Sequence, residues 1–226
     1  MNRGISQEGL KLFACLTMLM DHIGAVLLPW TPLRIIGRLS FPVFCFLIAE
    51  GTFHTRNPGK YGLRLALMAV VAELPFDLCF FGGINWGHQN VMFTLLLGFC
   101  AVLASKQVYS FWLKLLSVLP FLIPAYFIEA DYGVRGVMLI ILFGLTREMR
   151  LRPLVQSMGM FLIFMEPYGW PLFRVLGFPV TIQLMCVLAM VPIAMYSGEK
   201  QSSSKLLQWG FYLFYPVHMA ILCLLQ

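Results

Sequence analysis

Long apolar runs, separated by short polar connections, follow one another along the whole 226-residue chain. An α-helix needs about 20 mostly apolar residues to cross a bilayer. The runs predict nine membrane-spanning helices, at residues 9–29, 34–54, 60–82, 91–107, 110–128, 133–147, 152–167, 179–197 and 205–225. Residues 166–179 contain three prolines and are also compatible with a re-entrant or interfacial segment, which would leave eight crossings. We therefore expect an all-α polytopic bundle that forms a single domain over residues 1–226.

The composition supports a membrane protein. Hydrophobic residues make up 60% of the chain and charged residues 12%, whereas a soluble domain has about 25% charged residues. The first apolar run has no cleavage site before it, so we expect it to be retained. The six cysteines all lie in apolar runs without metal-ligand spacing, which argues against a metal site.

The basic residues predict an orientation. With a cytoplasmic N-terminus, 12 of the 16 lysines and arginines fall in cytoplasmic segments, leaving Arg34, Arg38, Arg135 and Arg174 on the other side. Cytoplasmic loops of membrane proteins carry an excess of Lys and Arg. The sequence thus predicts a multi-pass protein of the bacterial cytoplasmic (inner) membrane. The net charge of +6 then reflects orientation, and nucleic-acid binding is not supported.

Ionisable side chains interrupt several of the predicted spans. In the orientation above they lie toward the extracytoplasmic side, together with polar groups at the start of the fourth span: Asp21, His22, Arg38, Glu73, Asp77, His88, Asn90, Tyr215 and His218. Such groups are costly in lipid, so they usually face the bundle interior and mark a pathway or a reaction site. The structural alternative is that they form ion pairs between helices, such as Arg38 with Glu73 or Asp77.

Histidine is the side chain best suited to take up and return a proton near neutral pH. His22 is the first candidate for a general base and His218 the second. Asp21 and His22 point about 100° apart on a helix and cannot be partners, so we expect Asp77 or Glu73 to orient His22. If the reaction is an acyl transfer, Arg38, Asn90 or a hydroxyl group would donate to the oxyanion that develops on the acyl carbonyl.

A second group of charged residues lies near the predicted cytoplasmic ends of the helices. It comprises Glu50, His54, Arg56, Lys60, Arg64, Arg147, Arg150 and Arg152. Such clusters often serve only to fix topology, but they also suit the docking of a phosphate-rich ligand. Glu50 and His54 are four residues apart, so an intrahelical pair is expected between them.

Several short motifs, in order along nearly the whole chain, resemble the TraX family of membrane proteins. They are "LMDHIG", "GRLSFPVFCFLIAEG" followed by "FHTRN", "ELPFDLCFFG", "GHQNVMFTLLLG", "DYGVRGVMLI" and "FYLFYPVHMAIL". The resemblance places Asp21, His22, Arg38 and His218 at motif positions. The acidic pair in "ELPFDL" departs from family members encoded on conjugative plasmids. The roles of Glu73 and Asp77 are therefore inferred from the residues and not from the resemblance.

The resemblance implies a transmembrane acetyltransferase. It would take cytoplasmic acetyl-CoA as co-substrate and acetylate an amine or hydroxyl of an extracytoplasmic peptide or glycan, by family analogy the N-terminus of a pilin-like peptide. His88, Asn90 and Tyr215 would bind this acceptor. The resemblance does not choose between direct transfer and transfer through an acyl-histidine. It also does not determine the oligomeric state.

Two other functions fit the same residues. The buried acids and histidines could form the proton relay of a small proton-coupled transporter or flippase, although paired broken helices are not evident. Alternatively, the chain could be a scaffold without chemistry, in which the histidines serve only folding.

Overall fold

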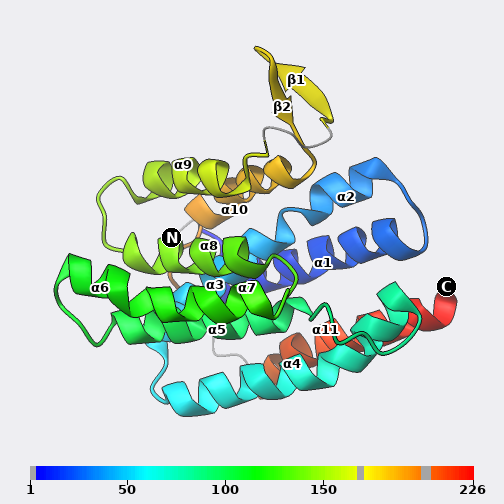
Figure 1. Ribbon diagram of the computed structural model, residues 1–226, viewed down its shortest axis with the longest axis horizontal. Helices are drawn as coiled ribbons and strands as arrows, with labels where there is room; N and C mark the ends of the chain where they lie inside the picture. The colour runs from blue at the N-terminus through cyan, green and yellow to red at the C-terminus, as the bar shows by residue number, and fades with distance from the viewer. Residues whose placement is uncertain (1–3, 167–170, 200–204) are drawn as a thin grey trace.

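The structure is a computed structural model that describes residues 4–166, 171–199 and 205–226. Apart from one short hairpin, its regular elements are helices. They are α1 (Gln7–Val26), α2 (Thr31–Gly37), α3 (Ser40–His54), α4 (Pro58–Phe81), α5 (Val91–Ser105), α6 (Phe111–Val118), η1 (Leu119–Phe121), α7 (Leu122–Phe127), α8 (Gly133–Leu145), α9 (Arg152–Phe164), η2 (Gln183–Ala189), α10 (Met190–Ala194) and α11 (Lys205–Leu225). Figure 1 shows most of them side by side in one bundle. The expected all-α architecture is confirmed.

Three helical segments of the described chain are long and apolar enough to cross a membrane: Gln7–Val26, Thr31–His54 and Leu206–Leu225. The other apolar helices are shorter. The predicted spans 110–128 and 179–197 are each divided into short α and 3₁₀ pieces. Both contain proline, which removes a helical hydrogen bond and breaks a regular helix.

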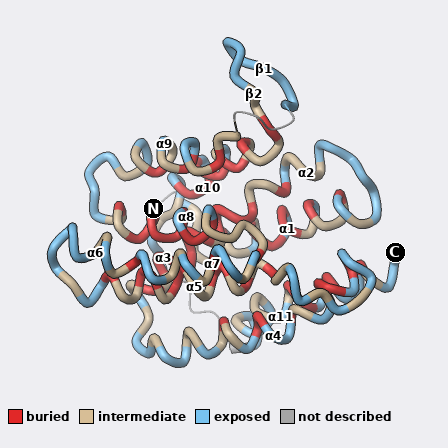
Figure 2. Tube along the Cα trace, in the orientation of Figure 1, coloured by how far each residue is buried: buried red, intermediate tan, exposed pale blue. Residues whose placement is uncertain are grey.

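Helix α3 forms the centre of the bundle. It contacts α1, α5, α8 and η2, and most of its residues are buried, as the red trace in Figure 2 shows. Helices α4 and α11 pack on each other and lie along one side of this centre (Figure 1). The site described below occupies the space between these two layers.

Helices α5 and α8 approach closely because glycines line their contact. A Cβ at Gly98 of α5 would overlap the side chain of Ile140. On α8, a Cβ at Gly144 would lie 2.7 Å from a methyl of Val102, again closer than real contacts allow. Small residues at helix interfaces permit such packing, as is common in membrane bundles.

The predicted span 34–54 is broken within its first turns. Helix α2 ends at Gly37 and α3 begins at Ser40. Pro42 has no N–H to bond the carbonyl of Arg38, four residues earlier, so a continuous helix loses a hydrogen bond at this point. The break leaves Arg38 at the joint between the two helices.

Residues 171–180 leave the bundle. Strands β1 (Phe173–Val175) and β2 (Phe178–Val180) form an antiparallel hairpin, which projects away from the helices in Figure 1. The turn residues Leu176 and Gly177 have φ of 49° and 85°, and Leu176 is 98% exposed. The described part of the proline-rich segment is therefore a hairpin and not a span, whereas residues 167–170 lie outside the described part.

Candidate functional site

A cavity of about 1030 Å³ lies between the central helices and the α4–α11 pair. One end, which we call the basic mouth, is lined by Lys11, Arg56, Lys60 and Arg64. The other end, which we call the histidine chamber, is lined by Asp21, His22, Arg34, Arg38, His88, Asp131, Tyr132 and Tyr215. Phe44, Leu47, Ile48 and Leu95 form the apolar part of the wall between them. Lys11 and His22 both lie on α1, eleven residues or about 16 Å apart along the helix.

The two histidines that interrupt the apolar helices meet in the chamber. His22 Nδ1 on α1 lies 2.6 Å from His218 Nε2 on α11, and the two rings are nearly parallel, at 13°. His218 Nδ1 in turn lies 2.6 Å from the backbone oxygen of Phe214. Of the two imidazoles, only His22 lines the cavity.

The carbonyl of Phe214 decides which ring nitrogens carry protons. A carbonyl oxygen only accepts hydrogen bonds, so Nδ1 of a neutral His218 must be the donor. Nε2 of His218 then accepts from Nδ1–H of His22, and Nε2 of His22 keeps its lone pair. The arrangement thus presents a neutral imidazole as a base, with its tautomer set by a fixed chain of acceptors.

Asp21 binds the two arginines of the helix joint. Arg34 Nη1 lies 3.1 Å from Asp21 Oδ2, and Nη2 of Arg38 donates to the same oxygen. Nη1 of Arg38 also donates to the hydroxyl of Tyr132 at 3.1 Å and to Oε1 of Gln183 at 3.0 Å. The partner of Arg38 is therefore Asp21, and not Glu73 or Asp77 as the structural alternative expected.

Glu73 and Asp77 do not contact His22 in the structure. Glu73 accepts from the side-chain amide of Asn90, and Asp77 accepts from the backbone N–H of Asn85 at 2.9 Å. Neither acid lines the cavity, nor does Asn90, whose side chain caps the start of α5. The expectation that an acid orients His22 was wrong, because the α4 acids secure the loop between α4 and α5 while α11 brings His218 to His22.

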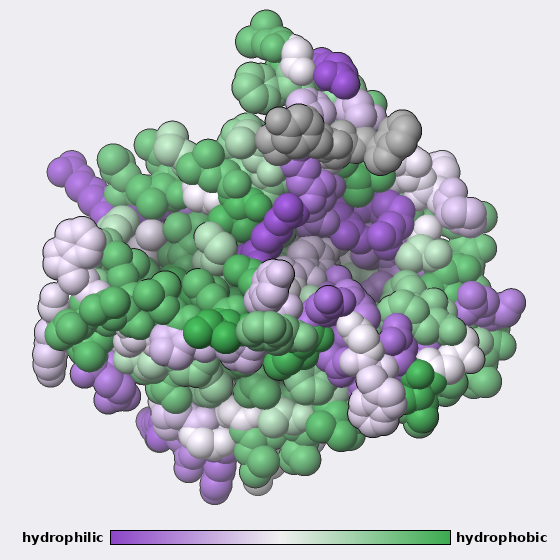
Figure 3. All heavy atoms as spheres, in the orientation of Figure 1, coloured by the Kyte–Doolittle hydropathy of each residue, from purple (hydrophilic) through white to green (hydrophobic). Residues whose placement is uncertain are grey.

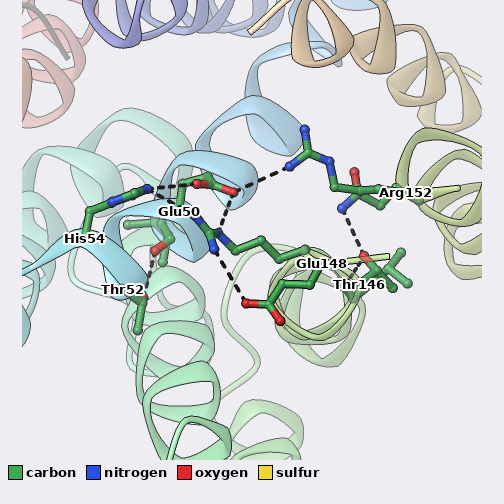
Figure 4. A network of polar contacts seen from close by, with 10 residues as sticks. Glu50, Thr52, His54, Thr146, Glu148 and Arg152 are labelled. Atoms are coloured by element: carbon green, nitrogen blue, oxygen red, sulfur yellow. Dashed lines mark hydrogen bonds and ion pairs between the residues drawn. The ribbon is translucent and has the colours of Figure 1, made fainter. Parts of the chain in front are cut away.

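Glu50 gathers much of the second charged group. Its carboxylate lies 3.3 Å from His54, 3.1 Å from Arg147 and 3.9 Å from Arg152. Figure 4 shows Glu50 between His54 of α3 and Arg152 of α9. The predicted intrahelical pair with His54 is confirmed. Arg147, Arg152 and the exposed Arg150 do not line the cavity.

The basic mouth is therefore built by a smaller set than the sequence indicated. His54, Arg56, Lys60 and Arg64 line it, and Arg64 lies over the rings of Tyr61 and Tyr212, at 5.9 and 5.6 Å. The buried Nε of Arg64 has no hydrogen-bond partner among the described residues. Lys11 lines the mouth too, although the sequence analysis did not select it.

The chamber also contains residues that the sequence analysis missed. Arg34, Asp131 and Tyr132 line it, and Gln183 binds Arg38. Arg34 precedes Arg38 by four residues, a spacing that places both on one helix face. Asp131 and Tyr132 open the "DYGVRG" motif, which was the available signal. Figure 3 shows hydrophilic side chains gathered around a hollow below the hairpin, within a largely apolar surface.

Comparisons with known proteins place the chain. The family described as "TraX protein" matches residues 6–226. The probable fimbrial assembly protein FimC, serogroup H1, of Dichelobacter nodosus is 29% identical over 98% of this chain and 96% of its own length. The uncharacterized protein RP591 of Rickettsia prowazekii (strain Madrid E) is 30% identical over 45% of this chain and 38% of its own. No solved structure matches. With a match over nearly its whole length, the chain belongs to the TraX family.

Proposed function

We propose that the protein is a membrane-embedded acetyltransferase, which moves an acetyl group from acetyl-CoA to an amine or hydroxyl on the opposite side of the membrane. One observation carries this proposal: a single cavity joins a basic mouth to a histidine whose free ring nitrogen can act as a base. TraX proteins are linked to pilin acetylation and assembly. The name of the Dichelobacter relative, a probable fimbrial assembly protein, points to a pilin-like peptide as acceptor.

The basic mouth suits the phosphates of CoA. Lys11, Arg56, Lys60 and Arg64 supply positive charge, and charge-assisted hydrogen bonds to phosphate are the strong ones. Nε of Arg64 is a buried donor without a partner in the described chain, and leaving such a donor unpaired is costly. The pantetheine arm would then follow the apolar wall toward His22, a distance that an extended arm covers.

His22 would take the acceptor proton. A protonated amine has no lone pair with which to attack, so Nε2 of His22 removes a proton first. The acceptor nitrogen then forms the C–N bond to the acetyl carbon as the C–S bond of the thioester breaks. The nitrogen loses its second proton to the thiolate, which gives CoA thiol, and the imidazolium of His22 releases the first proton to water. Tyr215 and Arg38 line the same chamber and are the donors we assign to the developing oxyanion.

The orientation follows from the proposed substrate. Acetyl-CoA is a cytoplasmic metabolite, so the basic mouth and the N-terminus would face the cytoplasm. The histidine chamber would open toward the extracytoplasmic side of a bacterial inner membrane, where the acceptor lies.

The test is labelled acetyl transfer by protein reconstituted in vesicles. His22→Ala is expected to lower turnover by roughly 10²-fold or more, the usual contribution of a general base. Met20→Ala, on the same helix but exposed, is the matched control and should keep turnover. Undiminished transfer by His22→Ala would remove this residue from catalysis.

Ligand binding separates this proposal from the transporter. Saturation with CoA at a hundred times its Kd should stabilise the protein by about 2.7 kcal/mol. If CoA does not stabilise the protein and no acetyl transfer is detected, the acetyltransferase proposal is overturned and proton-coupled transport is favoured. The bonding of Glu73 and Asp77 outside the cavity does not favour a relay through these acids.

A further inference from the structure

Asp131 is held in a tightly fixed loop at the histidine chamber. Its N–H donates to the carbonyl of Gln89 at 2.9 Å, and the carbonyl of Asp131 accepts from Thr94 Oγ1 at 2.6 Å. The next residue, Tyr132, has φ of 63°, a left-handed conformation that is uncommon outside glycine. These contacts fix the backbone of Asp131, and the residue lines the cavity.

The carboxylate of Asp131 lies at the cavity and, within the described part of the chain, has no charged side-chain partner such as Asp21 and Glu50 have. Asp21 has two arginines and Glu50 has Arg147 and His54, whereas Asp77, which does not line the cavity, accepts from one backbone N–H. Among the described residues, no ion pair and no side-chain hydrogen bond reaches the carboxylate of Asp131, and its neighbour Tyr132 offers only a backbone N–H. An Asp before a helix often caps it, but α8 has no side-chain cap.

The nearby arginines are directed to Asp21, and of their buried nitrogens only Nε of Arg38 is without a partner among the described residues. Arg34 and Arg38 both bind Asp21, and the remaining Nη1 contacts of Arg38 go to Tyr132 and Gln183. Burial raises the pKa of the Asp131 carboxyl above its ordinary value, and the nearby Arg38 and His88 only partly oppose this. A cation placed beside Asp131 would therefore be stabilised by a desolvated negative charge.

Aromatic rings form much of the remaining wall. Phe76, Phe80, Phe81, His88 and Tyr215 line the same cavity. The ring of His22 lies 6.0 Å from those of Phe80 and Tyr215, and His88 lies 6.0 Å from Phe76 and 5.9 Å from Phe81. Aromatic faces attract ammonium groups electrostatically. A carboxylate with several such rings is a suitable environment for an ammonium group.

We propose that Asp131 binds the ammonium group of the acceptor, so that the histidine chamber selects a primary amine over a hydroxyl. The identification of this cation with the acceptor rests on the proposed function. The bound R–NH₃⁺ gives one proton to Nε2 of His22, and the C–N bond forms as the C–S bond breaks. The second proton goes to the CoA thiolate, and the imidazolium returns its proton to water.

The test compares two probes that differ in one group: glycylglycinamide, with a free amine, and glycolylglycinamide, with a hydroxyl in its place. Their binding to the full-length protein in detergent is measured by calorimetry. Wild type is expected to bind the amine at least tenfold more tightly than the hydroxyl, and Asp131→Asn to bind both equally. Glu129→Gln, which removes a charge from an exposed residue of the same loop, should keep the wild-type preference.

Two results would overturn the role of Asp131: a wild type that does not prefer the amine, or an Asp131→Asn variant that keeps the preference. Stabilisation by CoA reports whether each variant is folded, and Asp131→Ser repeats the test with a smaller side chain. Acetyl transfer is measured separately. Amine preference without transfer would overturn the enzyme and keep the cation site, whereas transfer without preference would overturn the cation site alone.

Discussion

At the scale of single residues, the histidine chamber depends on a chain of three groups from two helices: the Phe214 carbonyl, His218 and His22. His22 and His218 are 196 residues apart in sequence. Each was visible in the sequence as an imidazole in an apolar run. Their contact could not be predicted, because it depends on how α11 packs against α1. The residue types of one helix do not specify which helix lies beside it.

His218 acts through His22 in the proposed reaction, so replacing it should change turnover more than substrate binding. We expect His218→Phe to lower kcat by roughly 10²-fold or more, since nothing then holds the tautomer of His22, with the KM for acetyl-CoA unchanged. His218→Gln, whose amide oxygen can accept from Nδ1–H of His22, should recover part of the loss. Equal kcat values for the two variants would contradict a role in positioning.

Residues at helix ends were the ones that the sequence hid. Polar side chains are ordinary near the ends of spans, so Arg34 and Asp131 gave no signal comparable to His22 in the middle of an apolar run. The pairing of Asp21 with Arg38 was also hidden. It requires the joint between α2 and α3, whereas the pattern of apolar residues predicted one continuous helix.

At the scale of elements, the apolar pattern predicted where helices lie but not how regular they are. Helices α1, α4, α5 and α8 follow the predicted spans within a few residues. Prolines divide the spans at 110–128 and 179–197, and the hairpin at Phe173–Val180 lies in the proline-rich segment that was also compatible with a re-entrant or interfacial path. Hydrophobicity reports burial or contact with lipid, and it does not by itself distinguish a helix from a strand.

The close contact of α5 with α8 gives a prediction about stability. Gly98→Ala places a methyl group where Ile140 lies, so the helices must separate or repack. We expect a loss of about 1–3 kcal/mol, the usual cost of overpacking, seen as a lower midpoint of thermal unfolding in detergent. Gly210→Ala on α11 is the control, because a methyl group there meets nothing within 4 Å. Similar midpoints for the two variants would show that the interface tolerates the extra volume.

At the scale of the whole molecule, the cavity places the proposed CoA site at one end and the proposed catalytic histidine at the other. Its two polar ends recruit residues from α1, α4 and the loops beside them. The sequence separated these two groups by depth alone. What it could not predict was the sorting within the basic group, where Glu50 draws Arg147 and Arg152 while Arg56, Lys60 and Arg64 line the cavity.

This sorting predicts which arginines and lysines bind acetyl-CoA. Arg64→Gln is expected to raise the KM for acetyl-CoA by at least about tenfold with little change in kcat, because a hydrogen bond to a charged group contributes about 1.5–3 kcal/mol. Lys114→Gln, on α6 and outside the cavity, should leave the KM unchanged. An equal effect of both substitutions would indicate that the overall positive potential attracts acetyl-CoA, and not a phosphate site at the basic mouth. The measurement is the rate of labelled acetyl transfer against acetyl-CoA concentration.

The apolar wall between mouth and chamber has an electrical consequence. An ion passing the apolar side chains of Phe44, Leu47, Ile48 and Leu95 would lose part of its hydration, which costs free energy. An uncharged acetyl thioester would not meet that barrier. In the proposed reaction an acyl group therefore changes sides without moving net charge through the membrane.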